Sequence, residues 1–201
     1  MKKGFKTVIA ALSVFVFFII ATALRFAANA LNSVLSADML GLAVLFVFML
    51  GYAFFIFYGY SLTVFALNEK KYLKALLFAA SAAVGAIASN VALNSFYGTK
   101  TSIVPIVAFA AMSYLIPFTL SFIMKNRAVM FTVTGIALVF LNILLLNAIS
   151  PEAATSLGAA FPNLRINSEI GDNNGVLSYL LYVVVFGVEY LALRKSYKKI
   201  C

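Results

Sequence analysis

Six long apolar segments dominate this sequence, and the positive charges lie almost entirely in every second connection between them. Twelve of the fifteen Lys and Arg residues precede the first segment, follow the sixth, or separate the second from the third or the fourth from the fifth. These twelve are Lys2, Lys3, Lys6, Lys70, Lys71, Lys74, Lys125, Arg127, Arg194, Lys195, Lys198 and Lys199. Arg25, Lys100 and Arg165 occupy the alternate connections. Short loops rich in Lys and Arg stay on the cytoplasmic side of a membrane, so the pattern predicts six crossings with both termini in the cytoplasm.

The composition also indicates a chain surrounded by lipid. Hydrophobic residues make up 64% of the chain and charged residues only 10%, whereas soluble domains carry about 25% charged residues. We therefore expect an all-α bundle that forms a single integral membrane domain over residues 1–201, in contact with the bilayer of the plasma or inner membrane. The net charge of +9 is explained by membrane orientation. The sequence has no basic stripe with interleaved aromatic residues, so it does not predict nucleic-acid binding.

The predicted helices have the length that a bilayer requires, which is about 17–25 apolar residues, except that the second is longer and must tilt or project. They are Thr7–Leu24, Met39–Leu67, Leu73–Leu93, Ile103–Met124, Ala128–Ile149 and Val176–Leu193. The short connection at residues 125–127 predicts an antiparallel hairpin of the fourth and fifth helices. The one larger external loop, about residues 150–175, begins with a helix N-terminus predicted at Ser150 and Pro151.

The N-terminus has some features of a signal peptide, namely a basic start and the small-residue sequence Ala28-Asn29-Ala30. However, the apolar run is longer than in most signal peptides, and Arg25 falls in the cleavage region. We therefore expect the first helix to be retained.

The residue types exclude much catalytic chemistry. The chain has no His, and its one Cys is Cys201. His-based acid–base catalysis, zinc sites built from His or several thiolates, and disulfides within the chain are thereby excluded. We predict no enzyme, no catalytic residue, no metal ligand and no cofactor, because few arrangements of nucleophile and base remain.

Glu189 is the one acid inside a predicted span. A charged side chain at the centre of a bilayer costs about 2.5–3.5 kcal/mol on insertion scales, and less near the interface. One interpretation is an interfacial carboxylate paired with a nearby Lys or Arg. The other is a proton- or cation-linked site, or a latch to a cytoplasmic partner. Tyr182, seven residues earlier on the same helix face, favours the second interpretation.

Asn90, Asn142 and Ser113 are further polar residues in the predicted spans, and with Tyr182 and Glu189 they define a candidate intramembrane polar site. Pro117 lies four residues after Ser113 and has no N–H, so the Ser113 carbonyl loses its helical partner. Such a position is either a static kink or a hinge beside a cavity.

The third predicted helix is dense in small residues, which allow another helix to approach closely. Ala79, Ala83, Gly85 and Ser89 define the candidate helix-packing face. This face either packs inside the bundle or docks another subunit. The second helix, by contrast, carries aromatic residues on all sides, which predicts packing or lipid contact, with an aromatic ligand site as the alternative.

Two functions fit these features. The first is a small transport-type subunit that moves a solute or peptide within a larger membrane complex, and it rests on helix number and size. The second is a non-transporting accessory or assembly subunit of such a complex. Polar residues that face one interior space would favour transport, and polar residues that face lipid or separate neighbours would favour the accessory subunit.

Overall fold

The computed structural model describes residues 3–32, 39–98, 103–148, 184–195 and 197. These residues contain no β-strand, and they form six helices. Five are α1 (Lys3–Asn32), α2 (Met39–Asn68), α3 (Tyr72–Tyr97), α4 (Val104–Ile123) and α5 (Arg127–Ala148), and residues 184–195 form the sixth. The predicted all-α class is thus confirmed for this part of the chain. The predicted external loop and the start of the last predicted span lie outside the described residues.

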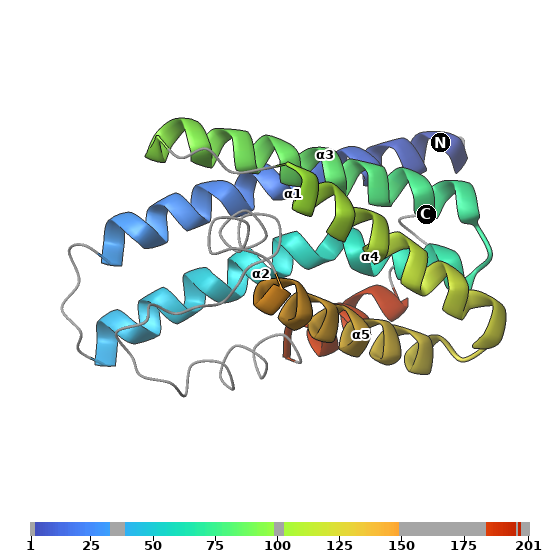
Figure 1. Cartoon of the computed structure of the whole chain (residues 1–201). Helices are drawn as coiled ribbons and strands as arrows, with labels where there is room; N and C mark the ends of the chain where they lie inside the picture. Colours follow the sequence, from blue (N-terminus) through green and yellow to red (C-terminus); the bar gives the residue numbers. More distant parts are fainter. Residues whose placement is uncertain (1–2, 33–38, 99–102, 149–183, 196, 198–201) are drawn as a thin grey trace.

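The first three helices pack against one another with α1 antiparallel to α2 (Figure 1). Gly51 of α2 faces Leu24 of α1, and eight residues further along α2, Gly59 faces Val14 of α1. Because the numbering rises along one helix and falls along the other, the two helices run in opposite directions. The α3 helix lies parallel to α1 and antiparallel to α2.

The remaining helices continue the alternation of direction. Tyr72, at the start of α3, stacks its ring 6.1 Å from that of Phe122, at the end of α4. Phe57 and Phe65 of α2 contact Phe186 and Tyr190 in that order, so residues 184–195 run parallel to α2. The starts of α1, α3 and α5 therefore lie at the same end of the bundle as the ends of α2, α4 and residues 184–195.

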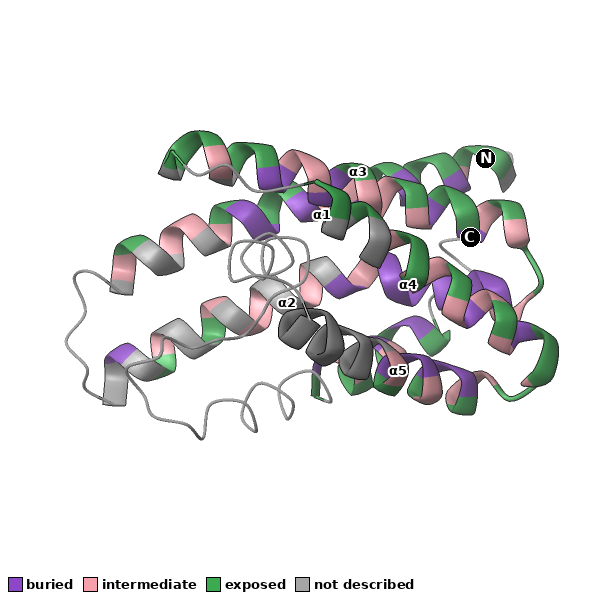
Figure 2. Cartoon of the chain, viewed as in Figure 1, coloured by how far each residue is buried: buried purple, intermediate pink, exposed green. Residues whose placement is uncertain are grey.

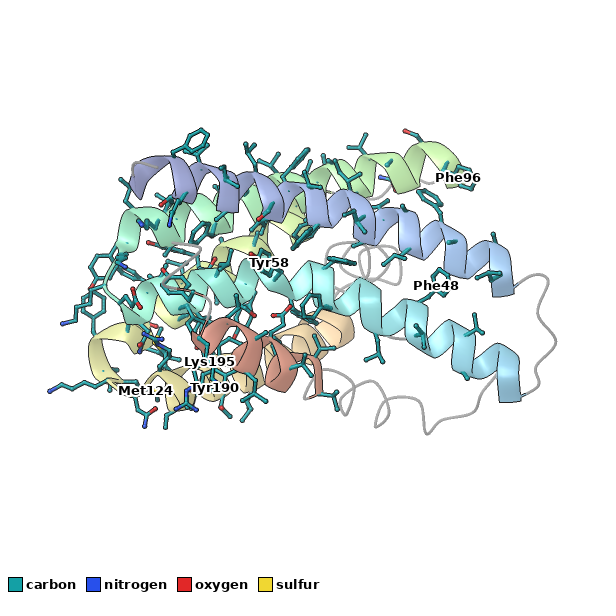
Figure 3. The ribbon with its side chains drawn as sticks, turned by 180° about the vertical axis from the view of Figure 1, so that it is seen from behind. Phe48, Tyr58, Phe96, Met124, Tyr190 and Lys195 are labelled. Carbon is teal, nitrogen blue, oxygen red and sulfur yellow. The ribbon has the colours of Figure 1, made fainter. Side chains whose placement is uncertain are left out.

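We call this end of the bundle the basic end, because most of the described positive charges are there. Its basic residues are Lys3, Lys6, Lys70, Lys71, Lys74, Lys125, Arg127, Arg194 and Lys195. Figure 3 shows Lys195 and Met124 at this end and Phe96 at the other. The tertiary structure thus gathers on one side the charges that the sequence distributes over alternate connections.

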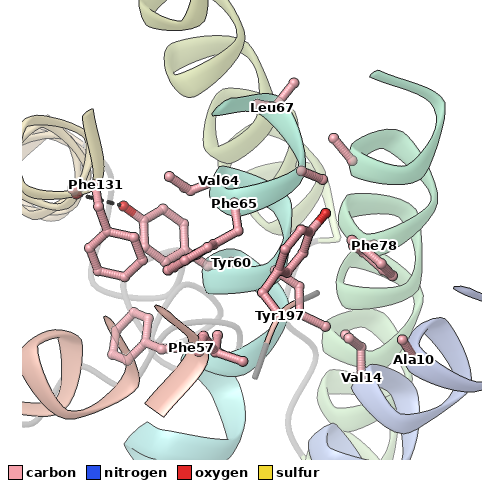
Figure 4. Packing of buried hydrophobic residues seen from close by; sticks show 14 of the residues in the cluster. Ala10, Val14, Phe57, Tyr60, Val64, Phe65, Leu67, Phe78, Phe131 and Tyr197 are labelled. Atoms are coloured by element: carbon pink, nitrogen blue, oxygen red, sulfur yellow. Dashed lines mark hydrogen bonds between the residues drawn. The ribbon is translucent and has the colours of Figure 1, made fainter. Parts of the chain in front are cut away.

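The α2 helix is the centre of the bundle. It packs against α1, α3, α4 and α5, and its aromatic side chains also contact residues 184–195. Every residue from Ser61 to Leu67 is buried (Figures 2 and 4). A helix that is hydrophobic on all sides is buried when other helices surround it. The aromatic residues of this part of α2 therefore serve packing inside the protein.

The outer surface of the bundle is apolar. Large hydrophobic side chains are exposed on the outward faces of several helices, as Leu73 (81%), Val104 (74%) and Ile123 (78%) show (Figure 2). Two described stretches, Gly4–Leu24 and Tyr72–Phe96, are long and apolar enough to cross a membrane, and Ala110–Ile123 and Arg127–Ala137 are apolar but shorter. By length and composition, the two longer stretches indicate association with a membrane.

The turn between α2 and α3 is a Schellman motif. The N–H of Lys70 donates to the carbonyl of Leu67 (2.9 Å), and the N–H of Lys71 donates to that of Ala66 (2.9 Å). Lys70 takes the left-handed conformation that this motif requires, with φ of 56°. The motif reverses the chain tightly and presents consecutive lysines at the basic end.

The end of α3 differs from the prediction. The helix continues past Leu93 to Tyr97, because polar side chains such as Asn94 do not by themselves end a helix. It ends at Gly98, whose φ of 66° is easily adopted without a Cβ and whose N–H donates to the carbonyl of Asn94.

Candidate functional site

Glu189 points into the bundle because of its position on an amphipathic helix. In residues 184–195, Val185, Glu189 and Leu193 are buried at four-residue spacing, whereas Val184 and Val188 are exposed. The side chains of residues four apart lie on one face of a helix. The acid therefore shares the face that packs against α2, and only 1% of its surface is exposed.

The partner of Glu189 is Ser61 of α2. The Ser61 hydroxyl donates a hydrogen bond to Oε2 of Glu189, and Oε1 has no hydrogen-bond partner among the described residues. The described ion pairs involve another acid, Glu69, rather than Glu189. In the described part of the chain, Glu189 is thus a carboxyl buried in the bundle and hydrogen-bonded to a hydroxyl, and its described contacts include no ion pair with Lys or Arg.

The residues beside Glu189 on its helix belong to a cluster of aromatic rings. Phe186, one turn before Glu189, lies 4.6 Å from Phe57 and 5.2 Å from Tyr60, measured between ring centroids. Tyr190, the next residue, lies 5.5 Å from Phe131 of α5. Rings of this kind exclude water and lower the local dielectric, which strengthens the electrostatic interactions that remain.

Tyr60 connects this aromatic cluster to α5. Its hydroxyl donates to the carbonyl of Phe131 at 3.3 Å, shown as a dashed line in Figure 4. Its phenol is also close enough to Glu189 and Thr134 to interact with both. The site therefore consists of Glu189, Ser61 and Tyr60, and Thr134 is a further neighbour of the phenol.

A small cavity lies on another side of Tyr60, between α1, α2, α3 and α4. Its volume is about 20 Å³, which accommodates about one water molecule. Its polar lining residues are Tyr60, Thr63 and Ser113, and its other walls are Phe18 and the alanines of α3 and α4. Ser113 also donates to the carbonyl of Ala110 at 2.7 Å.

The structure does not bring the described members of the predicted polar site together. Asn90 is buried on α3, where its Oδ1 accepts a hydrogen bond from Asn94 (2.9 Å), and it is not among the residues that line the cavity. Asn142 belongs to α5, but its side chain lies outside the described part of the structure, and so does Tyr182. Three members of the predicted site have described side chains, and each of them lies in different surroundings: Asn90, Ser113 and Glu189.

Sequence reasoning missed Ser61 and Tyr60. The available signal was the hydroxyl of Ser61 within an otherwise apolar helix, because such a group needs a partner when lipid surrounds the bundle. That partner is 128 residues away in the sequence. No spacing rule connects positions so distant, and only the packing of the last helix against α2 brings them together.

The candidate helix-packing face is turned inward in this chain. A Cβ added to Gly85 would lie 2.7 Å from the Cβ of Phe18, and Oγ of Ser89 lies 2.5 Å from Oγ1 of Thr22. Both contacts are with α1. Ala79 and Ala83 line the small cavity. The four residues therefore provide close packing inside the bundle.

A second polar cluster, also missed, joins two turns at the basic end. Glu69 forms ion pairs with Lys71 (2.6 Å) and Arg127 (3.0 Å). The Arg127 guanidinium also donates to Asn68 (3.3 Å) and lies 5.1 Å from the centroid of the Phe65 ring. This cluster fastens the end of α2 to the start of α5.

Comparison of the chain with protein families, with curated proteins and with solved structures found no match. The functional interpretation therefore follows from the geometry of the chain itself.

Proposed function

We propose that this chain crosses the plasma or inner membrane six times, with both termini in the cytoplasm. Three observations support this topology: the apolar outer surface, the alternating direction of the helices, and the gathering of basic residues at one end. Short basic connections remain on the cytoplasmic side of a membrane, so the basic end is the cytoplasmic end.

Within this bundle, we propose a transport-type subunit of a larger membrane complex, with Glu189 as its proton- or cation-linked group. The observation that carries the proposal is the burial of the Glu189 carboxyl beside Ser61. Acids inside membrane bundles are costly and rare, and those that face the interior commonly belong to ion pathways or proton relays. Other membrane subunits are the expected partners, and the transported solute or peptide is not specified by this geometry.

The second candidate is a non-transporting accessory or assembly subunit. It is favoured by the position of Asn90, which bonds to Asn94 and belongs neither to the cavity that Ser113 lines nor to the Ser61–Glu189 contact. Under this alternative, the buried carboxyl orients the last helix against α2 and moves no ion.

The test is reconstitution of the chain with the proteins that co-purify in mild detergent, followed by measurement of solute flux driven by a pH or Na⁺ gradient. Glu189→Gln preserves the shape of the side chain and removes its charge. The matched control is Glu69→Gln, which removes a carboxylate at the basic end. All variants are compared at equal insertion into vesicles.

We expect gradient-driven flux with the wild-type complex and with Glu69→Gln, and its loss with Glu189→Gln. If the Glu189→Gln complex has the same flux as the wild-type complex, the carboxyl is not required for transport. The accessory subunit would be favoured by two results together. The intact complex would show no flux, and Glu189→Gln would loosen the packing of the last helix.

A further inference from the structure

We propose that the ion exchanged at Glu189 is a proton, with Ser61 as the hydrogen-bond partner of the carboxyl and Tyr60, which also lines the water-sized cavity, as its neighbour. This inference rests on the proposed function, because it names the ion of that same site.

The contact with Ser61 serves both protonation states of Glu189. A hydroxyl group donates to an ionised carboxylate, and it accepts a hydrogen bond from a protonated carboxylic acid. The side chain can therefore gain or lose a proton at Oε2 while the contact between α2 and residues 184–195 is kept. Oε1 is buried and has no hydrogen-bond partner among the described residues, so it offers a second position for the proton.

The surroundings of Glu189 suit a proton better than a metal cation. A cation such as Ca²⁺ takes six to eight oxygen ligands, as a rule from several side chains and carbonyls. The described residues contain no group of three His, Cys, Asp or Glu side chains placed to hold a metal ion. The described polar groups that interact with Glu189 are the Ser61 hydroxyl and the Tyr60 phenol. One carboxyl oxygen is enough for a proton.

Tyr60 neighbours both the carboxyl and the water-sized cavity. It interacts with Glu189 on one side and lines the cavity with Thr63 and Ser113 on another. The hydrogen bond from its hydroxyl to the Phe131 carbonyl is 3.3 Å long, whereas hydroxyl donors usually lie about 2.7–2.8 Å from their acceptors. This hydrogen bond is therefore a weak one.

Among the described residues, the titratable groups near the site are few, and a further buried one, Tyr197, packs against Phe65. From α2, Tyr60 faces Glu189. The charged residue of α5 is Arg127, which its ion pair with Glu69 keeps at the basic end. On its own helix, Tyr190 and Arg194 follow Glu189. A pH-dependent signal from an interior carboxyl can therefore be assigned by substitution of Glu189 alone.

The experiment is an infrared pH titration of the purified full chain in lipid vesicles, recording the carbonyl absorption of protonated carboxyl groups. The difference between wild type and Glu189→Gln isolates one carboxyl from the other acids. We expect this signal to disappear reversibly as pH rises, and to be unaffected by Na⁺ or K⁺ at constant pH. Glu69→Gln should retain it.

Two further variants test the assigned neighbours. Ser61→Ala should shift the pH midpoint of the signal, and Ser61→Thr, which keeps a hydroxyl, should restore it. Tyr60→Phe should slow the exchange of the carboxyl proton for deuterium after transfer to D₂O. Circular dichroism and monodisperse elution establish beforehand that each variant is folded.

A carboxyl signal that does not change over the whole pH range would overturn the proposal. Loss of the signal on addition of Na⁺ at constant pH would also overturn it, because it would identify a metal-cation site while leaving the transport function in place. Conversely, a titrating carboxyl in a complex without flux would support the proton site and exclude the proposed transport. The two failures are thus distinguishable.

Discussion

Glu69 and Arg127 form an ion pair, 3.0 Å between Oε1 and Nη2, that joins the turn after α2 to the first residue of α5. The second carboxylate oxygen of Glu69 accepts from Lys71 at 2.6 Å. One acid thus lies between basic residues from two turns at the basic end. It reduces the repulsion that the gathering of Lys and Arg at this end creates.

Removal of this acid should destabilise the bundle by a small amount. Both side chains are partly buried, at 15% exposed for Glu69 and 25% for Arg127, and pairs near the surface contribute about 0–1 kcal/mol. Glu69→Gln should therefore lower the midpoint of thermal unfolding in detergent modestly, and more at low salt than at high salt. Lys125→Gln changes an exposed charge in the neighbouring turn and serves as control. Equal effects of the two substitutions at every salt concentration would contradict a specific role for the pair.

Lys70→Gly should stabilise the protein. Lys70 has a φ of 56°, and a non-glycine residue in this left-handed region costs about 1–2 kcal/mol. Glycine removes most of that cost where the Schellman motif requires the conformation. The midpoint of unfolding in detergent should rise. Lys71→Gly, at a residue with φ of −94°, is the matched control and should not raise it, because glycine there gains nothing and adds entropy to the unfolded chain.

Asn126→Ala should weaken the start of α5. The side-chain Oδ1 of Asn126 accepts hydrogen bonds from the backbone N–H groups of Ala128 (3.0 Å) and Val129 (3.4 Å), which makes Asn126 the N-cap. Loss of such a cap costs about 0.5–2 kcal/mol. Asn126→Asp keeps the acceptor and should retain near-native stability. If the Ala and Asp variants unfold at the same temperature, the cap does not stabilise α5.

Gly85→Ala should be much more damaging than Gly187→Ala. A Cβ at position 85 would lie 2.7 Å from the Cβ of Phe18, which cannot rotate away, whereas a Cβ at position 187 meets no atom within 4 Å. Overpacking of this kind costs about 1–3 kcal/mol. Unfolding midpoints and yields in detergent measure the difference. A stable Gly85→Ala protein that has lost a co-purifying subunit would instead assign this face to an interface between subunits.

The proposed topology predicts the accessibility of introduced tags. Tags at Lys71, at Asn126 and at the C-terminus should be protected from reagents that do not cross the membrane, because the basic end is cytoplasmic. A tag near Asn167 should be labelled from outside. External labelling of the C-terminus would contradict six crossings, because it requires an odd number of them.

The arrangement of the helices along the chain was largely predictable from the sequence. Apolar runs long enough to span a bilayer predicted Met39–Leu67, Ile103–Met124 and Ala128–Ile149, close to the observed α2, α4 and α5. The first predicted span, Thr7–Leu24, covers only the apolar run, whereas the helix extends from Lys3 to Asn32. Hydropathy locates the segment that fits lipid, whereas backbone geometry determines where a helix stops.

The interior contacts were not predictable, because they depend on which helix faces meet. Periodicity places Glu189 on a helix face, but the partner Ser61 comes from a helix that is distant in sequence and surrounded on all sides. Likewise, the small residues of α3 permit close approach by any neighbour, and only the packing places Phe18 of α1 against Gly85. The sequence by itself determined the helices and the alternation of charge, since both follow from local composition. The tertiary structure decided where the buried carboxyl finds its hydrogen bond, since that depends on the rotation and depth of each helix in the bundle.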